Sequence, residues 1–331
     1  MSGTSEITKR KAEKLCEELR EQKEAELKGI TGAKFTDATL AYYQNYVIGI
    51  EERKAATHKR VHDRYCYVVP QILEYFDGKL LTKIEKKDFV EYVQHLRRLG
   101  LKDSSIESNQ LRFVSAMYNY AESIGLCELH EIPNFRAIKR MLRKSKQRTR
   151  YLTESEFNRI YEFCKNSTDR ERRRTGRIIA FAVETGLRKE ELFSLQRKCI
   201  NVKDKHALIV DIKDKKNSRD RFIQLSDFAL QQLQQQQHDY IGVDSTFVFY
   251  NEQGARIIDS DTSYNKVMER LGIKDITFHD LRRTFGSWRL QGIRGEKFGI
   301  KKVSVRLGHK SVKQTEEAYA FLEEQGIKIE E

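Results

Sequence analysis

The sequence contains no uninterrupted apolar run long enough to cross a membrane, and its first twenty residues are rich in charged side chains. A membrane-spanning helix needs about 18 consecutive apolar residues and a secretory signal needs a shorter apolar run, so both are excluded. Its five cysteines, at positions 16, 66, 127, 164 and 199, include no C-x-x-C pair. This scattered spacing argues against a zinc site and a disulfide framework, and it is typical of reduced thiols in a cytoplasmic protein.

The chain also lacks a phosphate-binding P-loop, an EF-hand loop and an H-E-x-x-H motif. We therefore expect neither a nucleotide cofactor nor a bound metal. It has only two prolines. Pro70 is expected to interrupt or kink a helix, and Pro133 marks a break between two parts of the chain.

What the chain has in excess is positive charge, with 62 Lys and Arg residues against 49 Asp and Glu residues and a net charge of +13. More than half of this surplus lies in residues 136–150, which contain no acidic residue. The basic residues of this segment are Arg136, Lys139, Arg140, Arg143, Lys144, Lys146, Arg148 and Arg150. A charge run is usually a solvated face, but this one joins two patterned regions. We expect an extended linker that follows the phosphates of double-stranded DNA.

Four short motifs carry residues suited to phosphodiester chemistry. They are Thr-Gly-Leu-Arg ending at Arg188, His279 three residues before Arg282, Leu-Gly-His ending at His309, and a lone Tyr319. Arginine forks hold the non-bridging oxygens of a phosphate, and histidines donate to those oxygens or accept a proton near neutral pH. A tyrosine hydroxyl can attack the phosphorus and conserve the bond energy in a phosphotyrosine.

Together these motifs resemble the tyrosine recombinases, the lambda-integrase family of site-specific DNA recombinases, over residues 34 to 322. The resemblance implies a mainly helical fold with a small β-sheet, in which a helical core-binding domain and a catalytic domain clamp DNA. It also implies cleavage through a 3′-phosphotyrosine without a cofactor, and four protomers acting on two DNA sites.

The resemblance implies a role for each candidate residue. Arg188 and Arg282 are expected to bind the scissile phosphate together with His279 and His309, and His279 is also a candidate acid–base. Glu191, one helical turn after Arg188, is expected to orient the site.

The nucleophile and the general acid depend on spacing. Tyr319 lies ten residues after His309, one more than is usual in the family. That spacing leaves open whether the tyrosine serves its own active site or a neighbouring protomer's. In the predicted hairpin, Lys216 is the expected acid for the leaving 5′ oxygen, with Lys213 and Lys215 close enough to compete.

We divide the chain into a charged extension (1–33), a helical core-type DNA-binding domain (34–135), the basic linker (136–150) and a catalytic domain (151–331). Aromatic residues at helical spacing in the second part indicate a packed core rather than DNA contacts. Thr153 and Glu156 form a capping-box pattern that predicts a helix start. Residues 207–212 and 221–225 are rich in β-branched side chains that alternate along the chain, with a polar turn between them, and this pattern predicts a β-hairpin. Residues 247–250 are a candidate for another short strand.

Two alternatives stay open on the sequence. A type IB topoisomerase or telomere resolvase would use the same chemistry, whereas an inactive DNA-binding protein would need no nucleophile. The target sequence, and whether the DNA is integrated, excised or resolved, cannot be predicted from these residues.

Overall fold

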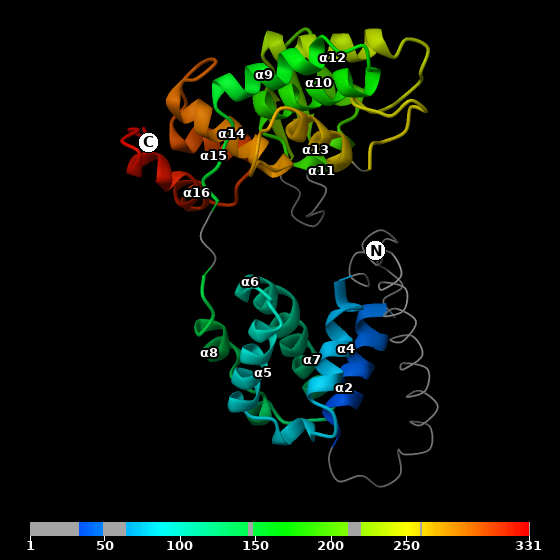
Figure 1. Cartoon of the computed structure of the whole chain (residues 1–331), viewed down its shortest axis with the longest axis vertical. Helices are drawn as coiled ribbons and strands as arrows, with labels where there is room; N and C mark the ends of the chain where they lie inside the picture. The colour runs from blue at the N-terminus through cyan, green and yellow to red at the C-terminus, as the bar shows by residue number, and fades with distance from the viewer. Residues whose placement is uncertain (1–32, 49–63, 145–147, 211–219, 259, 331) are drawn as a thin grey trace. The chain divides into compact units, whose positions relative to one another are not determined.

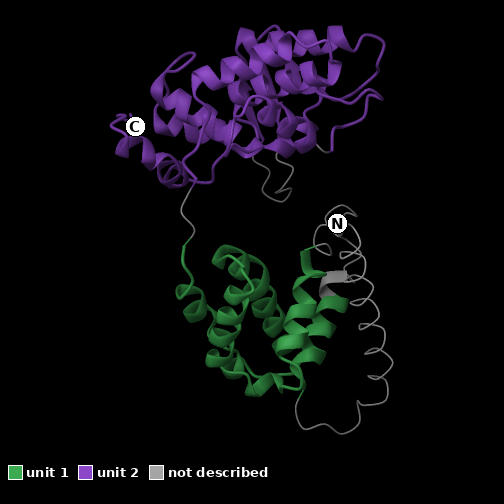
Figure 2. Ribbon diagram, in the orientation of Figure 1, with its two compact units in different colours: residues 1–146 green, residues 147–331 purple. Residues whose placement is uncertain are grey.

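The computed structural model describes residues 33–48, 64–144, 148–210, 220–258 and 260–330. The chain divides into two compact units, residues 1–146 and 147–331 (Figure 2). Residues 1–32 of the predicted N-terminal extension lie outside the described residues, as do Lys146 and the three hairpin lysines.

The first unit is built from helices, most of them short (Figure 1). They are α2 (Phe35–Tyr42), η1 (Tyr43–Ile48), α4 (Val68–Tyr75), η2 (Leu81–Lys83), α5 (Lys86–Arg98), α6 (Asp103–Ser105), η3 (Ile106–Leu111), α7 (Arg112–Ser123), η4 (Leu129–Glu131) and α8 (Phe135–Arg140). The predicted interruption near Pro70 is present, because the chain forms a turn at Cys66 and Tyr67 and α4 begins at Val68. Pro70 lies in the first turn of α4, where the missing N–H removes no intrahelical hydrogen bond, so it does not kink α4 itself.

Aromatic side chains fill the core of the first unit. Phe76, Phe89 and Tyr118 are fully buried. The Phe76 ring centroid lies 4.7 Å from that of Phe35 and 5.0 Å from that of Phe89, and the rings are tilted in the way that aromatic pairs prefer. The helical spacing of these residues therefore reflects packing, as the sequence indicates.

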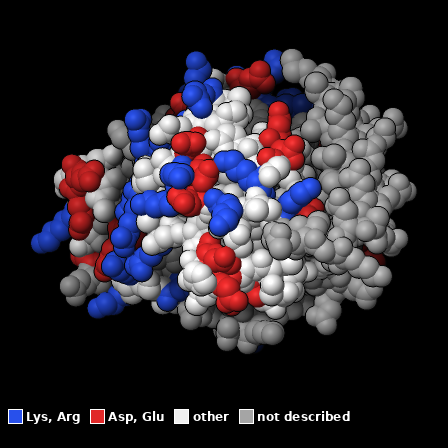
Figure 3. Space-filling view, turned by 90° about the horizontal axis from the view of Figure 1, so that it is seen from below, with Lys and Arg blue, Asp and Glu red and all other residues white. Residues whose placement is uncertain are grey.

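The basic segment begins inside this first unit. Residues 136–140 belong to α8, whose Phe135 and Ile138 are buried in the first core, so this part is helical rather than extended. Further along, the backbone N–H of Arg143 donates to the Asp103 carboxylate at 2.6 Å. The face seen in Figure 3 carries basic and acidic side chains side by side, so net charge alone does not mark a DNA-binding surface there.

The second unit surrounds the long helix α10, which contacts α9, α12, α13 and α14 (Figure 1). Its elements are α9 (Glu154–Lys165), α10 (Arg170–Thr185), α11 (Lys189–Ser194), η5 (Arg197–Cys199), β1 (Ile200–Asn201), β2 (His206–Ile209), β3 (Arg221–Gln224), α12 (Asp227–Asp239), α13 (Asp261–Arg270), α14 (Phe278–Gln291), α15 (Ile300–Leu307) and α16 (Val312–Glu324). The capping box at the start of α9 is confirmed, because Thr153 and Glu156 exchange both bonds.

The strands form an antiparallel sheet in the order β1-β2-β3. The predicted hairpin is confirmed, with Ala207 opposite Ile223 and Leu208 opposite Phe222. Its tip, residues 211–219, lies outside the described residues. The candidate strand at residues 247–250 is wrong, since this segment forms only isolated bridges.

Helices α14, α15 and α16 share a smaller core of their own, which includes Phe285, Leu307, Phe321 and Tyr319. In the described ranges, no helix combines the length and the apolarity needed to cross a membrane.

Candidate active site

The turn between α10 and α11 brings Arg188 to the site. Gly186 ends α10 at φ 65°, and a Cβ at this position would lie 2.5 Å from a ring carbon of Phe285. Glycine is therefore required both for the left-handed backbone and for the close approach of α14. The next turn of chain makes Arg188 the N-cap of α11, with its backbone N–H bonded to the Glu191 carboxylate at 2.9 Å.

Glu191 connects two arginines from different parts of the sequence. Its carboxylate accepts from Arg188 Nη1 at 2.6 Å and from Arg221 Nη1 and Nη2 at 3.1 and 2.8 Å. Burial alone would raise the pKa of Glu191, but the Arg221 hydrogen bonds and charge outweigh it and lower that pKa to about 2. Glu191 is therefore a fixed anion that orients both guanidinium groups.

Arg221 was not among the residues proposed from the sequence. Only 9% of its side chain is exposed, on strand β3 of the hairpin. In the sequence, Arg221 is marked only by its position in the closing strand of the hairpin, after the lysines. That position does not predict an ion pair with Glu191, which lies 30 residues earlier.

Arg282 lies in α14 and is 5% exposed. Its Nη1 donates to the carbonyl oxygen of Gly186 at 2.8 Å, so the turn that positions Arg188 also orients Arg282. Burial and the neighbouring charge of Arg188 lower the pKa of Arg282 to about 9. That value is above neutral pH, so the guanidinium keeps its charge.

The C-terminal end of α15 accepts hydrogen bonds from Arg188, Arg221 and Arg282. The carbonyl oxygens at positions 306, 307 and 308 accept, in that order, from Arg221 Nε at 3.0 Å, from Arg282 Nη2, and from Arg188 Nη2 at 2.8 Å. A helix C-terminus leaves its last carbonyls without intrahelical partners and carries partial negative charge. Gly308 closes this end at φ 64°, and a Cβ there would lie 2.9 Å from Arg221 Nη1.

His309 follows directly on this end and is half-buried. Its Nδ1 lies 2.8 Å from Thr315 Oγ1 on α16. Burial first, and then the charges of Arg282 and the other guanidinium groups, lower the pKa of His309 to about 4. The imidazole is therefore neutral at physiological pH.

His279 lies in the first turn of α14, three residues before Arg282, and its side chain is exposed at the surface. Desolvation by the surrounding protein, together with the charges of Arg282 and Arg283, lowers the pKa of His279. Arg283 itself donates to the Asp280 carboxylate.

Tyr319 lies in α16 with 3% of its surface exposed. Its hydroxyl and ring pack against Gly286 of α14, four residues after Arg282, close enough that a Cβ on Gly286 would lie 2.1 Å from the phenolic oxygen. Burial raises the pKa of Tyr319 to about 12, and the charges of Arg282 and Arg283 oppose the increase. Despite the longer spacing, the tyrosine reaches the arginine-bearing helix of its own chain.

The basic residues after α8 have varied surroundings. Arg148 donates to Asp280 at 2.9 Å and Arg150 donates to Glu156 at 3.0 Å, so both are held by the second unit. On the first unit, Arg136, Arg140, Arg143 and Lys144 are exposed and Lys139 is partly buried.

The mainly helical fold with its small antiparallel sheet is that of a tyrosine recombinase. The chain belongs to the phage integrase family, whose sequence profile matches residues 150–325. It is 28% identical over 158 residues to the integrase of Salmonella phage P22; the match covers 44% of this chain and 38% of that integrase.

Solved structures show the same fold at low sequence identity. The Tn1549 transposon integrase in complex with circular intermediate DNA superposes with a TM-score of 0.67 at 16% identity, covering 87% of this chain and 95% of that one. A lambda integrase dimer bound to a COC′ core site gives 0.66 at 17% identity, over 87% and 77% of the two chains. The XerH recombinase bound to a palindromic difH substrate gives 0.64 at 15% identity, over 90% and 89%.

Proposed function

We propose that this protein is a site-specific DNA recombinase or integrase that cuts and rejoins DNA through a 3′-phosphotyrosine on Tyr319. The proposal depends on one arrangement of three residues. The guanidinium groups of Arg188 and Arg282 both donate hydrogen bonds to carbonyl oxygens at the C-terminal end of α15, and Tyr319 packs against the helix that contains Arg282. Arg188 is paired with the Glu191 carboxylate, whereas the acceptors of Arg282 within the described part of the chain are the carbonyl oxygens of Gly186 and Leu307, which leave its charge available to a phosphate.

In the proposed reaction Arg188 and Arg282 hold the non-bridging oxygens of the scissile phosphate and stabilise the charge that grows on them. His309 adds a neutral N–H donor, which its low pKa keeps uncharged. Glu191 contacts no DNA in this scheme; it positions Arg188.

The bonds and protons balance over two steps. The Tyr319 oxygen bonds to phosphorus as the bond to the 5′ oxygen breaks; the phenol proton passes to His279, which is neutral at pH 7, and Lys216 protonates the 5′ oxygen. A 5′ hydroxyl from another strand then attacks the phosphotyrosine and gives its proton to the now neutral Lys216. The bond from phosphorus to the Tyr319 oxygen breaks, and that oxygen takes back the proton held by His279. Lys216 lies outside the described residues, so its role rests on the family resemblance.

DNA is the proposed partner. The lambda, XerH and Tn1549 proteins were each solved on DNA, and one lambda integrase structure is a tetramer bound to a Holliday junction. We extend this to a tetramer of the present chain on two sites on the nucleoid, with the exposed basic residues around α8 following the phosphates.

The test separates recombination from simple relaxation. DNA fragments that the protein protects are cloned as pairs into one supercoiled plasmid, and the products are scored after incubation with wild-type protein or Tyr319→Phe. Exchange between paired sites, lost in Tyr319→Phe, is the expected result. Relaxation that needs no paired site would indicate a topoisomerase instead, and no reaction at all would indicate a DNA-binding protein.

A further inference from the structure

Thr315 lies near the start of α16 and is completely buried. Its Oγ1 lies 2.8 Å from Nδ1 of His309, the histidine that follows the C-terminal end of α15. Thr315 also precedes Tyr319 by four residues, so the two side chains lie on one face of the helix that carries the proposed nucleophile. The contact between Thr315 and His309 therefore joins two parts of the candidate active site.

The Thr315 hydroxyl has an unusual partner for a buried threonine in a helix. Such a hydroxyl often donates to the carbonyl oxygen one turn earlier. Thr175 of α10 does so, with its Oγ1 2.9 Å from the carbonyl oxygen of Glu171. Among the described residues, the hydrogen-bond partner of the Thr315 hydroxyl is instead the His309 ring. The hydroxyl proton of Thr315 therefore has Nδ1 of His309 as its acceptor.

This partner determines which nitrogen of His309 is protonated. The ring is neutral at physiological pH, so one of its two nitrogens carries a proton and the other accepts. A proton on Nδ1 would be donated to Oγ1, and the buried hydroxyl proton of Thr315 would then lack an acceptor, which costs free energy. With the proton on Nε2, the hydroxyl donates to Nδ1 and both groups are satisfied.

The second ring nitrogen, Nε2, is open to a ligand. It has no hydrogen-bond partner among the described residues and is not one of their enclosed, unbonded atoms. Burial, and then the charges of Arg282 and Arg188, lower the pKa of His309, so the ring lies beside the two guanidinium groups proposed to hold the scissile phosphate. A proton on Nε2 is available to a phosphate oxygen, whereas a proton on Nδ1 is already bonded to Thr315.

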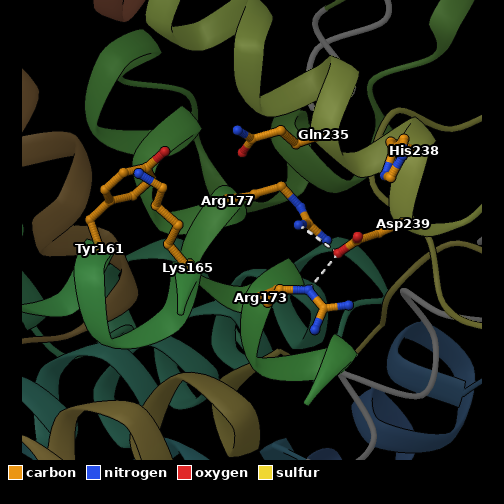
Figure 4. A pocket seen from close by; sticks show the side chains of 8 residues that line it. Tyr161, Lys165, Arg173, Arg177, Gln235, His238 and Asp239 are labelled. Carbon is orange, nitrogen blue, oxygen red and sulfur yellow. Dashed lines mark hydrogen bonds and ion pairs between the residues drawn. The ribbon is translucent and has the colours of Figure 1, made fainter. Parts of the chain in front are cut away.

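A polar contact elsewhere in the second unit illustrates a purely structural role. In the pocket between α9, α10 and α12, Asp239 Oδ2 accepts from Arg173 Nε at 2.8 Å and from Arg177 Nη1 at 2.9 Å (Figure 4). These ion pairs join α10 to α12, and none of the proposed active-site residues lines the pocket. Thr315 differs, because its partner is a proposed active-site residue with an open nitrogen.

We propose that Thr315 is a positioning residue, whose hydroxyl donates to Nδ1 of His309 and keeps the ring proton on Nε2, where the scissile phosphate can accept it. The hydroxyl itself touches no DNA and transfers no proton in the reaction. The consequence for cleavage rests on the proposed function, but the position of the ring proton can be measured without DNA.

The ring proton is located by long-range proton–nitrogen correlation NMR of the full-length protein with isotope-labelled histidine at pH 7. The His309 signals are assigned by their loss in His309→Gln. We expect a protonated Nε2 and an unprotonated Nδ1 in the wild type. Thr315→Val, which removes the hydroxyl and keeps the branched shape, should give a mixture of the two neutral forms, and Thr315→Ser should restore the wild-type pattern. A proton on Nδ1 in the wild type, or the same pattern in wild type and Thr315→Val, would overturn the proposal.

The consequence is tested by the rate of cleavage of DNA fragments that the protein protects. Thr315→Val should be slower by about tenfold, as when a partner that orients a histidine is lost, and Thr315→Ser should stay close to wild type. Thr175→Val is the matched control, because it removes a buried hydroxyl that bonds within its own helix, and it should change neither the cleavage rate nor the His309 signals.

A second background separates positioning from packing. His309→Gln has no ring proton to place, so adding Thr315→Val to it should slow cleavage no further. An equal further loss in that background would show that Thr315 supports only the packing of α16, and the proposal would fail. Wild-type protein that cleaves no DNA would contradict the proposed function, whereas the NMR pattern would still decide whether Thr315 fixes the ring proton.

Discussion

The phenol of Tyr319 rests directly on the backbone of Gly286, so that a Cβ on Gly286 would lie 2.1 Å from the hydroxyl oxygen and 2.3 Å from Cζ. Neighbouring atoms cannot approach so closely, so this arrangement tolerates only glycine at position 286. Because Tyr319 is also 97% enclosed, it has to move before a DNA phosphate can reach it.

We predict that Gly286→Ala has opposite effects with and without the tyrosine ring. With Tyr319 present, the added methyl group should lower the free energy of unfolding by about 1–3 kcal/mol, the usual cost of overpacking. In a Tyr319→Ala background the clash is gone, and alanine's helix propensity should stabilise α14 by about 0.5–1 kcal/mol. Urea unfolding of the four proteins measures both effects, and the same effect in both backgrounds would show that the ring does not rest on Gly286.

Glu191 should make stability depend on pH in the acid range. Its folded-state pKa of about 2 lies below the ordinary 4.5, so its contribution is complete above pH 4.5 and is lost as the pH falls towards 2. The shift corresponds to a contribution on the order of 3 kcal/mol. Glu191→Gln should therefore be less stable than wild type at pH 7, and the gap measured by urea unfolding should narrow at pH 3. A gap that stays constant with pH would contradict the ion-pair role.

His309 should titrate far below an ordinary histidine. Its folded pKa of about 4 lies below the ordinary 6.5, so the neutral ring stabilises the fold above pH 6.5, and this contribution disappears between pH 6.5 and 4. NMR titration of the ring should give a midpoint near 4. In DNA cleavage, His309→Ala should be slower by about 10²-fold, as for a lost oxyanion donor. His309→Gln keeps an N–H donor and should be affected much less; equal losses would mean that the neutral donor is not what matters.

The exposed basic residues near α8 should set DNA affinity through charge. Replacing Arg140 and Arg143 by Ala should weaken binding to all sequences alike and lower the salt slope by about 2, one unit for each lost phosphate contact. The matched control replaces Arg148 and Arg150, which pair with Asp280 and Glu156. That control should lower Tm and leave the salt slope unchanged. If both pairs changed the slope equally, the whole segment would follow DNA.

Local signals in the sequence were enough to predict several elements. The Thr153 capping box and the alternating pattern before Ile223 describe contacts within a few residues or across one turn, and both are present. The order of the motifs also predicted that Arg188, Arg282 and His309 lie in one site, because this order and spacing are typical of the family. In the structure all three lie around the C-terminal end of α15.

The remaining site depends on contacts between distant parts of the chain. Nothing near Arg221 indicates that it binds Glu191, and nothing near Arg148 indicates that it is held by Asp280. Residues 247–250 have strand-forming side chains, but within the described ranges they form only isolated bridges, Phe247 with Gln196 and Tyr250 with Arg256, and not a ladder. Periodicity describes which face is apolar, whereas these contacts depend on how the helices pack.

The most direct test of the account identifies the residue that becomes joined to DNA. Protected DNA is nicked next to the cleavage position so that the covalent intermediate is trapped, and the denaturant-resistant adduct is digested and mapped by mass spectrometry. We expect DNA to be attached to the peptide that contains Tyr319. The adduct should form equally well in EDTA, because arginines neutralise the phosphate, and it should be absent from Tyr319→Phe. An adduct on any other residue, or one that persists in Tyr319→Phe, would contradict it.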